Sequence, residues 1–248
     1  MKTYTIIGGV NGTGKSSLTG VLKTQTTDLG QIIDVDKITA ENGGSAIQGG
    51  KIALERIRAC LDKGISFTQE TTLSGRKTEL TAQEARERGY SVRLFYVGLD
   101  SAEECLQRIE NRVAHGGHDI REEDVLRRFA GRWEAVTKVL PYCDEAHFFD
   151  NYNGFVEVAE YVNGELIVKG NKLPAWIQEF RQFLQTARIY QETDRKRIGE
   201  RPEGSHCQSV RSVPLPALST SPSVASAEFR GYTGLGPELK PSVEQSGS

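Results

Sequence analysis

The sequence predicts an α/β protein built on a doubly wound, mainly parallel sheet, and three observations lead to this prediction. Short apolar segments alternate with helix-like segments over about the first 190 residues. The segment at residues 92–99 is almost continuously apolar, which is typical of a strand that is covered on both faces of a parallel sheet. A glycine-rich turn at residues 9–16 joins the first apolar segment to a helix-like one. Repeated right-handed strand–helix–strand units of this kind build such a sheet.

Four strands are predicted in the first half of the chain, together with the helices that connect them. The first helix is expected to begin inside the glycine-rich turn. The spacing of apolar residues predicts a second helix over residues 46–61, and a charged helix is predicted to end at Gly89. The four strands are predicted at residues 3–8, 31–36, 66–70 and 92–99.

The second half is predicted to hold two helices, a short strand, a β-hairpin and a final helix. Asn163-Gly164 stands between two apolar segments, and this dipeptide is a strong signal for the turn of a hairpin. Pro174 predicts the start of the final helix, because proline is favoured at the first helical position. The elements before this helix are predicted at residues 101–114, 121–140, 146–150 and 155–168.

Composition divides the chain into two parts. Residues 1–188 are predicted to form one domain, with a lid at about residues 112–128. Residues 189–248 are rich in serine, proline and glycine and poor in aliphatic clusters. Such a segment cannot bury enough apolar surface to offset the entropy of ordering it, so a disordered tail is predicted there.

The overall composition favours a cytoplasmic enzyme. The chain has 31 basic and 33 acidic residues, and this near-neutral balance gives no reason to expect nucleic acid or a membrane as a partner. No apolar run has the length of a membrane span, and a strand pattern begins almost at once, so no signal peptide is expected. The four cysteines are widely spaced without a C-x-x-C pair, which fits reduced thiols.

The turn at residues 9–16 matches the pattern G-x-x-x-x-G-K-[ST], with a predicted strand before it and a helix after it. Its glycines allow successive N–H groups to face phosphate oxygens, and the helix adds its positive N-terminal end. Lys15 can reach the β- and γ-phosphates, and the Ser16 hydroxyl can ligate Mg²⁺. The alternative is a glycine-rich turn with an accidental lysine. The motif predicts a P-loop NTPase with ATP and Mg²⁺ as cofactors, and its predicted ATP-binding residues are Gly9, Val10, Asn11, Gly12, Thr13, Gly14, Lys15, Ser16 and Ser17.

Acidic residues stand at the ends of the second and third predicted strands, at the edge where a doubly wound sheet binds ligands. Asp36 is predicted to be a general base that orients and deprotonates an acceptor hydroxyl. The alternative is that Asp34 or Asp36 only caps the next helix, which is a common use of aspartate at such a junction. Glu70, Thr71 and Thr72 are predicted to bind the acceptor, and Glu70 could also support Mg²⁺ through water.

Arginines flank the glycine-rich loop of the predicted lid, where they could close over ATP and neutralise charge on the transferred phosphoryl group. Arg112 precedes this loop. On the helix predicted after it, Arg121, Arg128 and Arg132 fall on one flank of the apolar face at about 100° per residue, while Arg127 points away. Arg112 and Arg128 are predicted to act in catalysis, and Arg121 and Arg132 are further lid candidates. The alternative is that surface arginines are simply solvated.

Several segments beyond the P-loop add to this pattern. They are residues 66–75, Arg112-Val113, Gly116-Gly117-His118, Arg127-Arg128-Phe129 and Asp150-Asn151. Together with residues 9–16 they resemble the zeta-toxin-like P-loop kinases, in particular the short bacterial branch often labelled a predicted ABC-type ATPase. The resemblance covers roughly residues 1–190.

This resemblance implies an adenylate-kinase-like fold and an ATP-dependent phosphotransferase with an alcohol acceptor. The typical acceptor is a nucleotide-activated sugar, UDP-N-acetylglucosamine. It further implies that Asp36 is the base, that Glu70 contacts the substrate, and that Arg112 and another lid arginine bind phosphates. For some members it implies a toxin with an antitoxin protein as partner.

Four positions depart from the pattern of this family, and two other functions stay open. Asp34-Val35 stands where the branch often has asparagine and alanine, Tyr152 where it has serine, and Arg121 where it has proline. One alternative function is a kinase of another small hydroxylated metabolite. The other is an ATP-binding regulatory module that transfers no phosphate.

Overall fold

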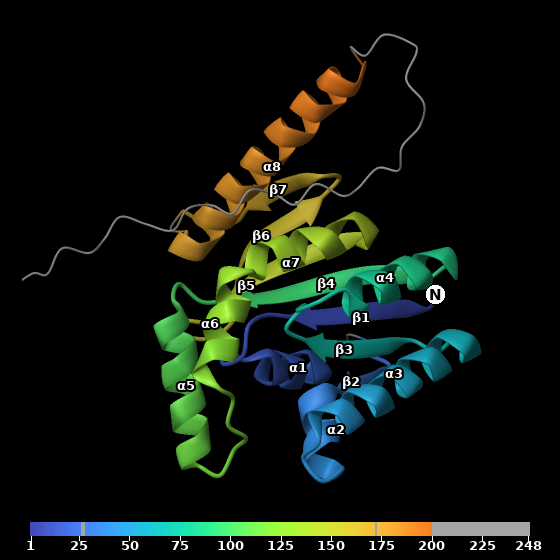
Figure 1. Cartoon of the computed structure of the whole chain (residues 1–248), viewed down its shortest axis with the longest axis vertical. Helices are drawn as coiled ribbons and strands as arrows, with labels where there is room; N and C mark the ends of the chain where they lie inside the picture. Colours follow the sequence, from blue (N-terminus) through green and yellow to red (C-terminus); the bar gives the residue numbers. More distant parts are fainter. Residues whose placement is uncertain (26–27, 172, 200–248) are drawn as a thin grey trace, which may run out of the picture. The chain divides into compact units, whose positions relative to one another are not determined.

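The computed structural model describes residues 1–25, 28–171 and 173–199, and a seven-stranded sheet runs through this part of the chain (Figure 1). The strand order is β2-β3-β1-β4-β5-β6-β7. The first five strands in this order pair in parallel, and β6 and β7 are antiparallel. This confirms the predicted sheet with its C-terminal hairpin. The strands are β1 (Thr3–Gly8), β2 (Gln31–Asp34), β3 (Phe67–Thr71), β4 (Ser91–Gly98), β5 (Glu145–Asp150), β6 (Val156–Val162) and β7 (Glu165–Val168).

The helices begin and end at residues with recognisable capping roles. The side chains of Asp34, Ser45 and Ser101 accept hydrogen bonds from backbone N–H groups at the starts of α2, α3 and α5. Gly64 ends α3 in the left-handed conformation that favours glycine. The helices are α1 (Lys15–Thr24), α2 (Val35–Glu41), α3 (Ala46–Lys63), α4 (Lys77–Glu87), α5 (Ala102–Ala114), α6 (Glu122–Ala130), α7 (Arg132–Val139) and α8 (Ala175–Gly199).

Helices cover both faces of the sheet, as a doubly wound arrangement requires. Side chains alternate along a strand, so Tyr4 and Ile6 of β1 point to one face and Ile7 points to the other. On the first face α3, α4, α7 and α8 contribute to the main apolar core. On the second face Leu18 and Leu22 of α1 pack against Ile7. The carboxyl ends of the parallel strands are thereby held at one edge, next to the start of α1.

The second strand is shorter than the sequence predicted, and a helix follows it directly. A strand was expected over residues 31–36, but β2 ends at Asp34 and α2 begins at Val35. The Asp34 carboxylate accepts hydrogen bonds from the N–H groups of Asp36 and Lys37, at 3.0 and 3.2 Å. This local cap ends the strand, and it places Asp36 in the first turn of α2.

The helix predicted over residues 121–140 consists of two helices, so that expectation was wrong. Gly131 separates α6 from α7. The two helices bury their apolar side chains in different places, which one straight helix could not do. Val125 of α6 packs in a small cluster beside the P-loop, whereas Trp133 and Val136 of α7 pack in the main core.

The hairpin was predicted correctly from its turn. Asn163 and Gly164 have φ angles of 52° and 83°. Both values are positive, as the favoured two-residue hairpin turn requires. The register pairs Val162 with Glu165 and Ala159 with Val168.

The C-terminal helix extends beyond the predicted domain boundary. Residues 189–199, which were assigned to a disordered tail, continue the backbone of α8 to Gly199. The rest of the predicted tail, residues 200–248, lies outside the described residues. Within the described residues, every helix is too short or too polar to cross a bilayer.

Candidate active site

The P-loop adopts the backbone conformation that its glycines allow. Gly9, Gly12 and Gly14 have φ angles of 149°, 84° and 98°, in a region that residues with a side chain rarely adopt. A methyl group on any of them would also meet neighbouring atoms. The added carbon would lie 2.3 Å from the Cys105 carbonyl oxygen at Gly12 and 2.4 Å from Asn151 Nδ2 at Gly14. The predicted need for glycine is therefore both conformational and steric.

One carbonyl group closes the loop from within. The Val10 oxygen accepts hydrogen bonds from Thr13 N, Thr13 Oγ1 and Lys15 Nζ, at 3.3, 2.9 and 3.0 Å. Burial lowers the pKa of Lys15, while the carboxylates of Asp36 and Glu70 act in the opposite direction. The lysine is thus held inside the loop, where two acidic side chains favour its charged form.

Glu70 lies under the start of α1, where its carboxylate binds two hydroxyl groups. It accepts hydrogen bonds from Ser16 Oγ at 2.6 Å and from Thr19 Oγ1 at 2.5 Å. Its pKa is raised by burial, although the Ser16 and Thr19 hydrogen bonds oppose this change. In the sheet Glu70 is in register with Asp34 of β2 and with Ile7 of β1. The strand ends therefore bring two acidic residues to the side of the P-loop.

A pocket of about 490 Å³ extends from the P-loop across these strand ends. Its walls come from the P-loop, the ends of β2 and β3, one side of α3, the start of α4, and the helices α5 and α6. Most of the predicted site residues line it. They are Asn11, Gly12, Gly14, Lys15, Ser16, Ser17, Asp36, Glu70, Thr71, Thr72, Arg112 and Arg128. Gly9, Val10 and Thr13 support the loop without lining the pocket.

Asp34 at the end of β2 and Asp36 at the start of α2 take different positions in this pocket. Asp34 and Asp36 both line it. The Asp34 carboxylate is engaged by the backbone of α2 and forms the cap that was considered as an alternative role. Asp36 is exposed at the pocket wall, in the first turn of the helix.

The predicted lid arginines separate into two groups. Arg128 Nη1 donates to Asn11 Oδ1 of the P-loop at 2.5 Å. Arg112 Nη2 donates to the carbonyl oxygen of His118 at 2.5 Å, and both of these residues line the pocket. Arg112 and Arg128 therefore both lie at the pocket, and Arg128 contacts the P-loop directly.

Arg121 and Arg132, the other two candidates, lie away from the pocket lining. Arg121 pairs with Asp124 at 3.0 Å and its side chain is 77% exposed. Arg132 stacks over Phe129, pairs with Glu179 of α8, and has a side chain that is only 10% exposed. The break at Gly131 turns Arg132 out of the flank that a continuous helix would have given it. Arg132 belongs to the packing between helices.

Three residues that the sequence did not single out for the site also belong there. Arg108 lines the pocket one helical turn before Arg112, and this spacing alone could have identified it. Lys77 lines the pocket at the start of α4. Asn151 Nδ2 donates to the Thr13 carbonyl oxygen at 2.8 Å. That contact joins residues far apart in the sequence, so no local pattern could predict it.

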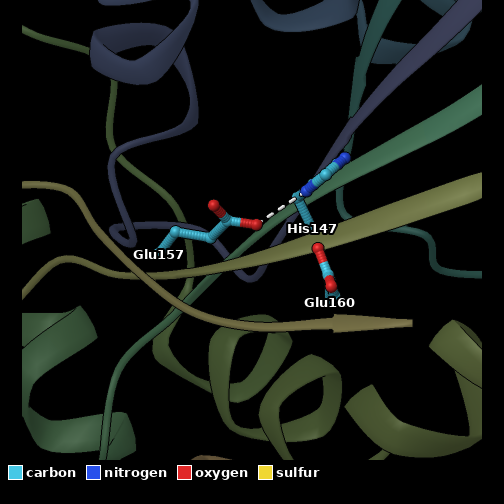
Figure 2. A group of neighbouring side chains, drawn as sticks. All are labelled: His147, Glu157 and Glu160. Atoms are coloured by element: carbon cyan, nitrogen blue, oxygen red, sulfur yellow. Dashed lines mark hydrogen bonds and ion pairs between the residues drawn. The ribbon is translucent and has the colours of Figure 1, made fainter. Parts of the chain in front are cut away.

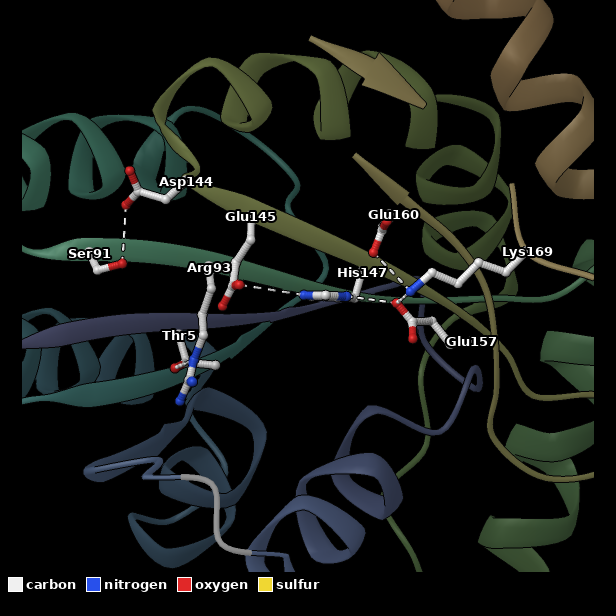
Figure 3. Close-up of polar contacts among 9 residues, drawn as sticks. All are labelled: Thr5, Ser91, Arg93, Asp144, Glu145, His147, Glu157, Glu160 and Lys169. Carbon is white, nitrogen blue, oxygen red and sulfur yellow. Dashed lines mark hydrogen bonds and ion pairs between the residues drawn. The ribbon is translucent and has the colours of Figure 1, made fainter. Parts of the chain in front are cut away.

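A second polar cluster lies on the face of the sheet that carries α1. Figure 2 shows His147 and Glu157 pointing toward one another, with Glu160 beside them. Each of the three offers one nitrogen or oxygen atom that could ligate a metal, and these atoms lie within 4.8 Å of one another. His147 Nδ1 is 2.7 Å from Glu157 Oε1. Lys169 Nζ lies 2.8 Å from a carboxylate oxygen of both Glu157 and Glu160 (Figure 3). The ammonium group of Lys169 thus already supplies the cation that this cluster attracts.

Comparison with known proteins identifies a relative by sequence. No protein-family model matches the chain. An uncharacterized protein of Haemophilus influenzae (strain ATCC 51907 / DSM 11121 / KW20 / Rd) is 36% identical over 127 residues, which are 49% of this chain and 88% of that protein. The chain belongs to the same family as this Haemophilus influenzae protein.

Solved structures share the fold at low sequence identity. The native AvrRxo1-ORF1:-ORF2 complex has a TM-score of 0.53 at 18% identity, covering 73% of this chain and 64% of that one. The match therefore spans less than two thirds of that chain. A structure from the PezAT chromosomal toxin–antitoxin system of Streptococcus pneumoniae has a TM-score of 0.52 at 16% identity, covering 81% and 87%. These likenesses identify a P-loop kinase-like fold with antiparallel C-terminal strands.

Proposed function

We propose that this protein is an ATP-dependent kinase that transfers the γ-phosphate of ATP to a hydroxyl group of a small molecule. The proposed acceptor is a nucleotide-activated sugar such as UDP-N-acetylglucosamine. One observation carries the proposal. A single pocket is lined by the P-loop lysine Lys15, by Asp36 and Glu70 at the strand ends, and by the lid arginines Arg112 and Arg128.

The P-loop half of the pocket suits the phosphates of ATP. Its backbone N–H groups and the N-terminus of α1 attract anionic oxygens, and Lys15 adds a positive charge. The AvrRxo1-ORF1:-ORF2 structure determined with ATP has a TM-score of 0.50 with this chain at 19% identity, and this favours ATP as the nucleotide.

The same region offers oxygen ligands for Mg²⁺, which prefers them to nitrogen or sulfur. The Ser16 hydroxyl donates a hydrogen bond to Glu70 at 2.6 Å, and this leaves lone pairs on the serine oxygen for a cation. Ser16 would hold the ion, with Glu70 supporting it directly or through water. When bound, Mg²⁺ neutralises charge on the β- and γ-phosphates.

In the proposed reaction Asp36 is the general base. The acceptor hydroxyl oxygen forms a bond to the γ-phosphorus of ATP, and the bond between that phosphorus and the bridging oxygen of ADP breaks. The hydroxyl proton passes to the Asp36 carboxylate, and ADP leaves with the electron pair of the broken bond. Arg112 and Arg128 neutralise the charge that develops on the transferred group.

The acceptor half of the pocket combines apolar and hydroxyl-bearing walls. Ala53, Leu54 and Ile57 of α3 provide the apolar wall, and Thr71 and Thr72 follow β3 on the other side. Such walls suit a sugar-like acceptor that carries both hydroxyl and apolar groups. The same walls would suit another small hydroxylated metabolite, so an acceptor screen has to decide between them.

A protein partner is a further part of this proposal. PezAT is a toxin–antitoxin system, and the AvrRxo1 structure is a complex of the products ORF1 and ORF2. Their shared fold supports a search for a small antitoxin-like protein that binds this chain. Such a partner would place the kinase in a toxin–antitoxin pair without changing the chemistry proposed for the pocket.

The direct test is transfer of label from γ-labelled ATP·Mg²⁺ into a panel of UDP-sugars, nucleosides and small hydroxy acids. Lys15→Ala and Asp36→Ala are assayed in parallel. Label in UDP-N-acetylglucosamine that disappears in both variants supports the full proposal. Label only in another acceptor corrects the substrate. Binding of ATP without transfer to any acceptor, unaffected by Asp36→Ala, would favour a nucleotide-binding regulatory module instead.

A further inference from the structure

The loop after β5 lies against the P-loop and contacts it through one side chain. Asn151 Nδ2 donates a hydrogen bond to the carbonyl oxygen of Thr13 at 2.8 Å. Asn151 also lies close to Gly14. A carbon added at Gly14 would lie 2.4 Å from the same nitrogen and 3.6 Å from the ring of Phe155. Gly14 thus leaves room for Asn151 beside the loop.

This hydrogen bond fixes the direction of one peptide group. The Thr13 carbonyl and the Gly14 N–H belong to the same planar trans peptide, in which the two bonds point in opposite directions. The carbonyl is held toward Asn151, so the Gly14 N–H is turned away from it. Gly14 lines the pocket, whereas Thr13 does not. The hydrogen bond from Asn151 therefore favours the orientation of this peptide in which the Gly14 N–H faces away from Asn151.

Asn151 is itself held from two directions. Its own carbonyl oxygen accepts a hydrogen bond from Arg108 Nη2 at 2.6 Å, which ties it to the lid helix α5. The preceding residue, Asp150, accepts a hydrogen bond from the indole Nε1 of Trp176 at 2.9 Å. The ring of Trp176 is fully buried, and its backbone N–H donates to Asp100 Oδ1 at 2.9 Å. The start of α8 is thereby connected to the P-loop through Asp150 and Asn151.

We propose that Asn151 is a positioning residue for nucleotide binding, which orients the Gly14 N–H toward the phosphates, and that Trp176 anchors it. This inference rests on the proposed nucleotide-binding function. It gives a role to Asp150-Asn151 at the end of β5, a segment for which the transfer chemistry alone provides none. It also makes the first turn of α8 part of the nucleotide site, although α8 belongs to the packing of the sheet.

The experiment compares Asn151→Leu with Asn153→Leu, a matched substitution at an exposed asparagine of the same loop. Leucine keeps the approximate size of the side chain and removes the donor. A lost hydrogen bond of this kind predicts a rise of about 2- to 10-fold in the Kd for ATP·Mg²⁺, measured by calorimetry. The Asn153 variant should match the wild type. Thermal unfolding of each protein establishes that it is folded at the assay temperature.

A second readout separates positioning from general stability. With ¹⁵N-labelled glycine, the Gly14 amide resonance of the wild type should shift strongly when ADP·Mg²⁺ is added, and this shift should be lost in Asn151→Leu. Trp176→Phe, which keeps an aromatic ring and removes the indole N–H, should raise the Kd less than Asn151→Leu. The double variant should have the same Kd for ATP·Mg²⁺ as Asn151→Leu alone, because both changes act through the same contact.

The outcomes distinguish this inference from the proposed function. A wild-type protein that binds no ATP·Mg²⁺ would refute the proposed function. If the wild type binds ATP·Mg²⁺ but the Asn151 and Asn153 variants have equal Kd values, the role of Asn151 alone is overturned. The same holds if Asn151→Leu shows the same Gly14 shift as the wild type when ADP·Mg²⁺ is added. Additive effects of Asn151→Leu and Trp176→Phe would overturn the role of Trp176 as its anchor.

Discussion

The carboxylate of Glu70 accepts a hydrogen bond from the Ser16 hydroxyl at 2.6 Å, across 54 residues of sequence. This contact joins the end of β3 to the first turn of α1. It also means that the residue expected to ligate Mg²⁺ and an acidic residue of the neighbouring strand act as one unit. Because Glu70 is only 7% exposed, its charge is costly to the fold in the absence of a cation.

Replacing Glu70 by glutamine should therefore stabilise the protein while lowering its activity. Burial raises the pKa of Glu70, which means that ionising this carboxyl destabilises the folded protein. The stability of the neutral form is fully present below the unfolded-state pKa, and it is lost as the pH rises through the folded-state pKa. Glu70→Gln should raise the Tm at pH 7.5, and the difference from wild type should shrink toward pH 4. Transfer activity should fall by about 10- to 100-fold, as is usual when a group that supports a metal ligand is removed. Thermal unfolding across this pH range checks the prediction, and a lower Tm at pH 7.5 would contradict it.

Substitution of the two aspartates by asparagine should separate the base from the cap. Asparagine caps helices as well as aspartate does, so Asp34→Asn should leave stability nearly unchanged. Asp36→Asn removes the proposed base and should lower the transfer rate by about 100- to 10,000-fold, with ATP binding retained. Initial rates and calorimetric Kd values give both quantities. A larger loss of rate in Asp34→Asn than in Asp36→Asn would reverse the assignment.

The lid arginines should divide into functional and structural residues. Arg128→Gln should weaken ATP binding or transfer by about 10-fold or more, because a charged hydrogen-bonding group beside the phosphates is lost. Arg132→Gln should lower the free energy of unfolding by about 1–2 kcal/mol, since its guanidinium stacks over Phe129 and Trp133. Arg121→Gln, at an exposed position, serves as the control and should change neither property. Transfer assays and denaturant unfolding test all three variants, and unaltered ATP affinity and rate in Arg128→Gln would remove it from the site.

Two glycine-to-alanine substitutions should change stability in opposite directions. A carbon added at Gly98 would lie 2.6 Å from the Trp176 ring, so Gly98→Ala should destabilise the protein by about 1–3 kcal/mol through overpacking. At Gly20, within α1, such a carbon meets nothing within 4 Å, so Gly20→Ala should stabilise by about 0.4–1 kcal/mol. Denaturant unfolding measures both effects. Equal stability of the two variants would contradict the packing described around Trp176.

Much of the fold followed from local patterns in the sequence. The continuous apolar run at β4 predicted a strand covered on both faces, and its side chains are indeed buried on both sides of the sheet. The Asn163-Gly164 turn predicted the hairpin because few other residues adopt two successive positive φ angles. The P-loop was recognisable since its glycines and lysine are adjacent in sequence and act together.

Predictions that depended on the path of the chain over longer distances were less accurate. The continuous helix predicted over residues 121–140 placed Arg132 beside Arg128, and the break at Gly131 separates them. The spacing was correct for a straight helix. It failed because Val125 and Trp133 are drawn into two different apolar clusters. Helical periodicity carries no information about such a choice.

The sequence by itself determined the strands, the P-loop and the acidic strand ends, because each depends on residues close together in the chain. It also placed Asp36 and Glu70 near one another, since parallel strands end at the same edge of the sheet. Only the tertiary structure decided that Arg132 serves packing and that Asn151 contacts the P-loop. These roles depend on which distant groups compete for one donor, one acceptor or one buried space, and that competition exists only in the folded chain.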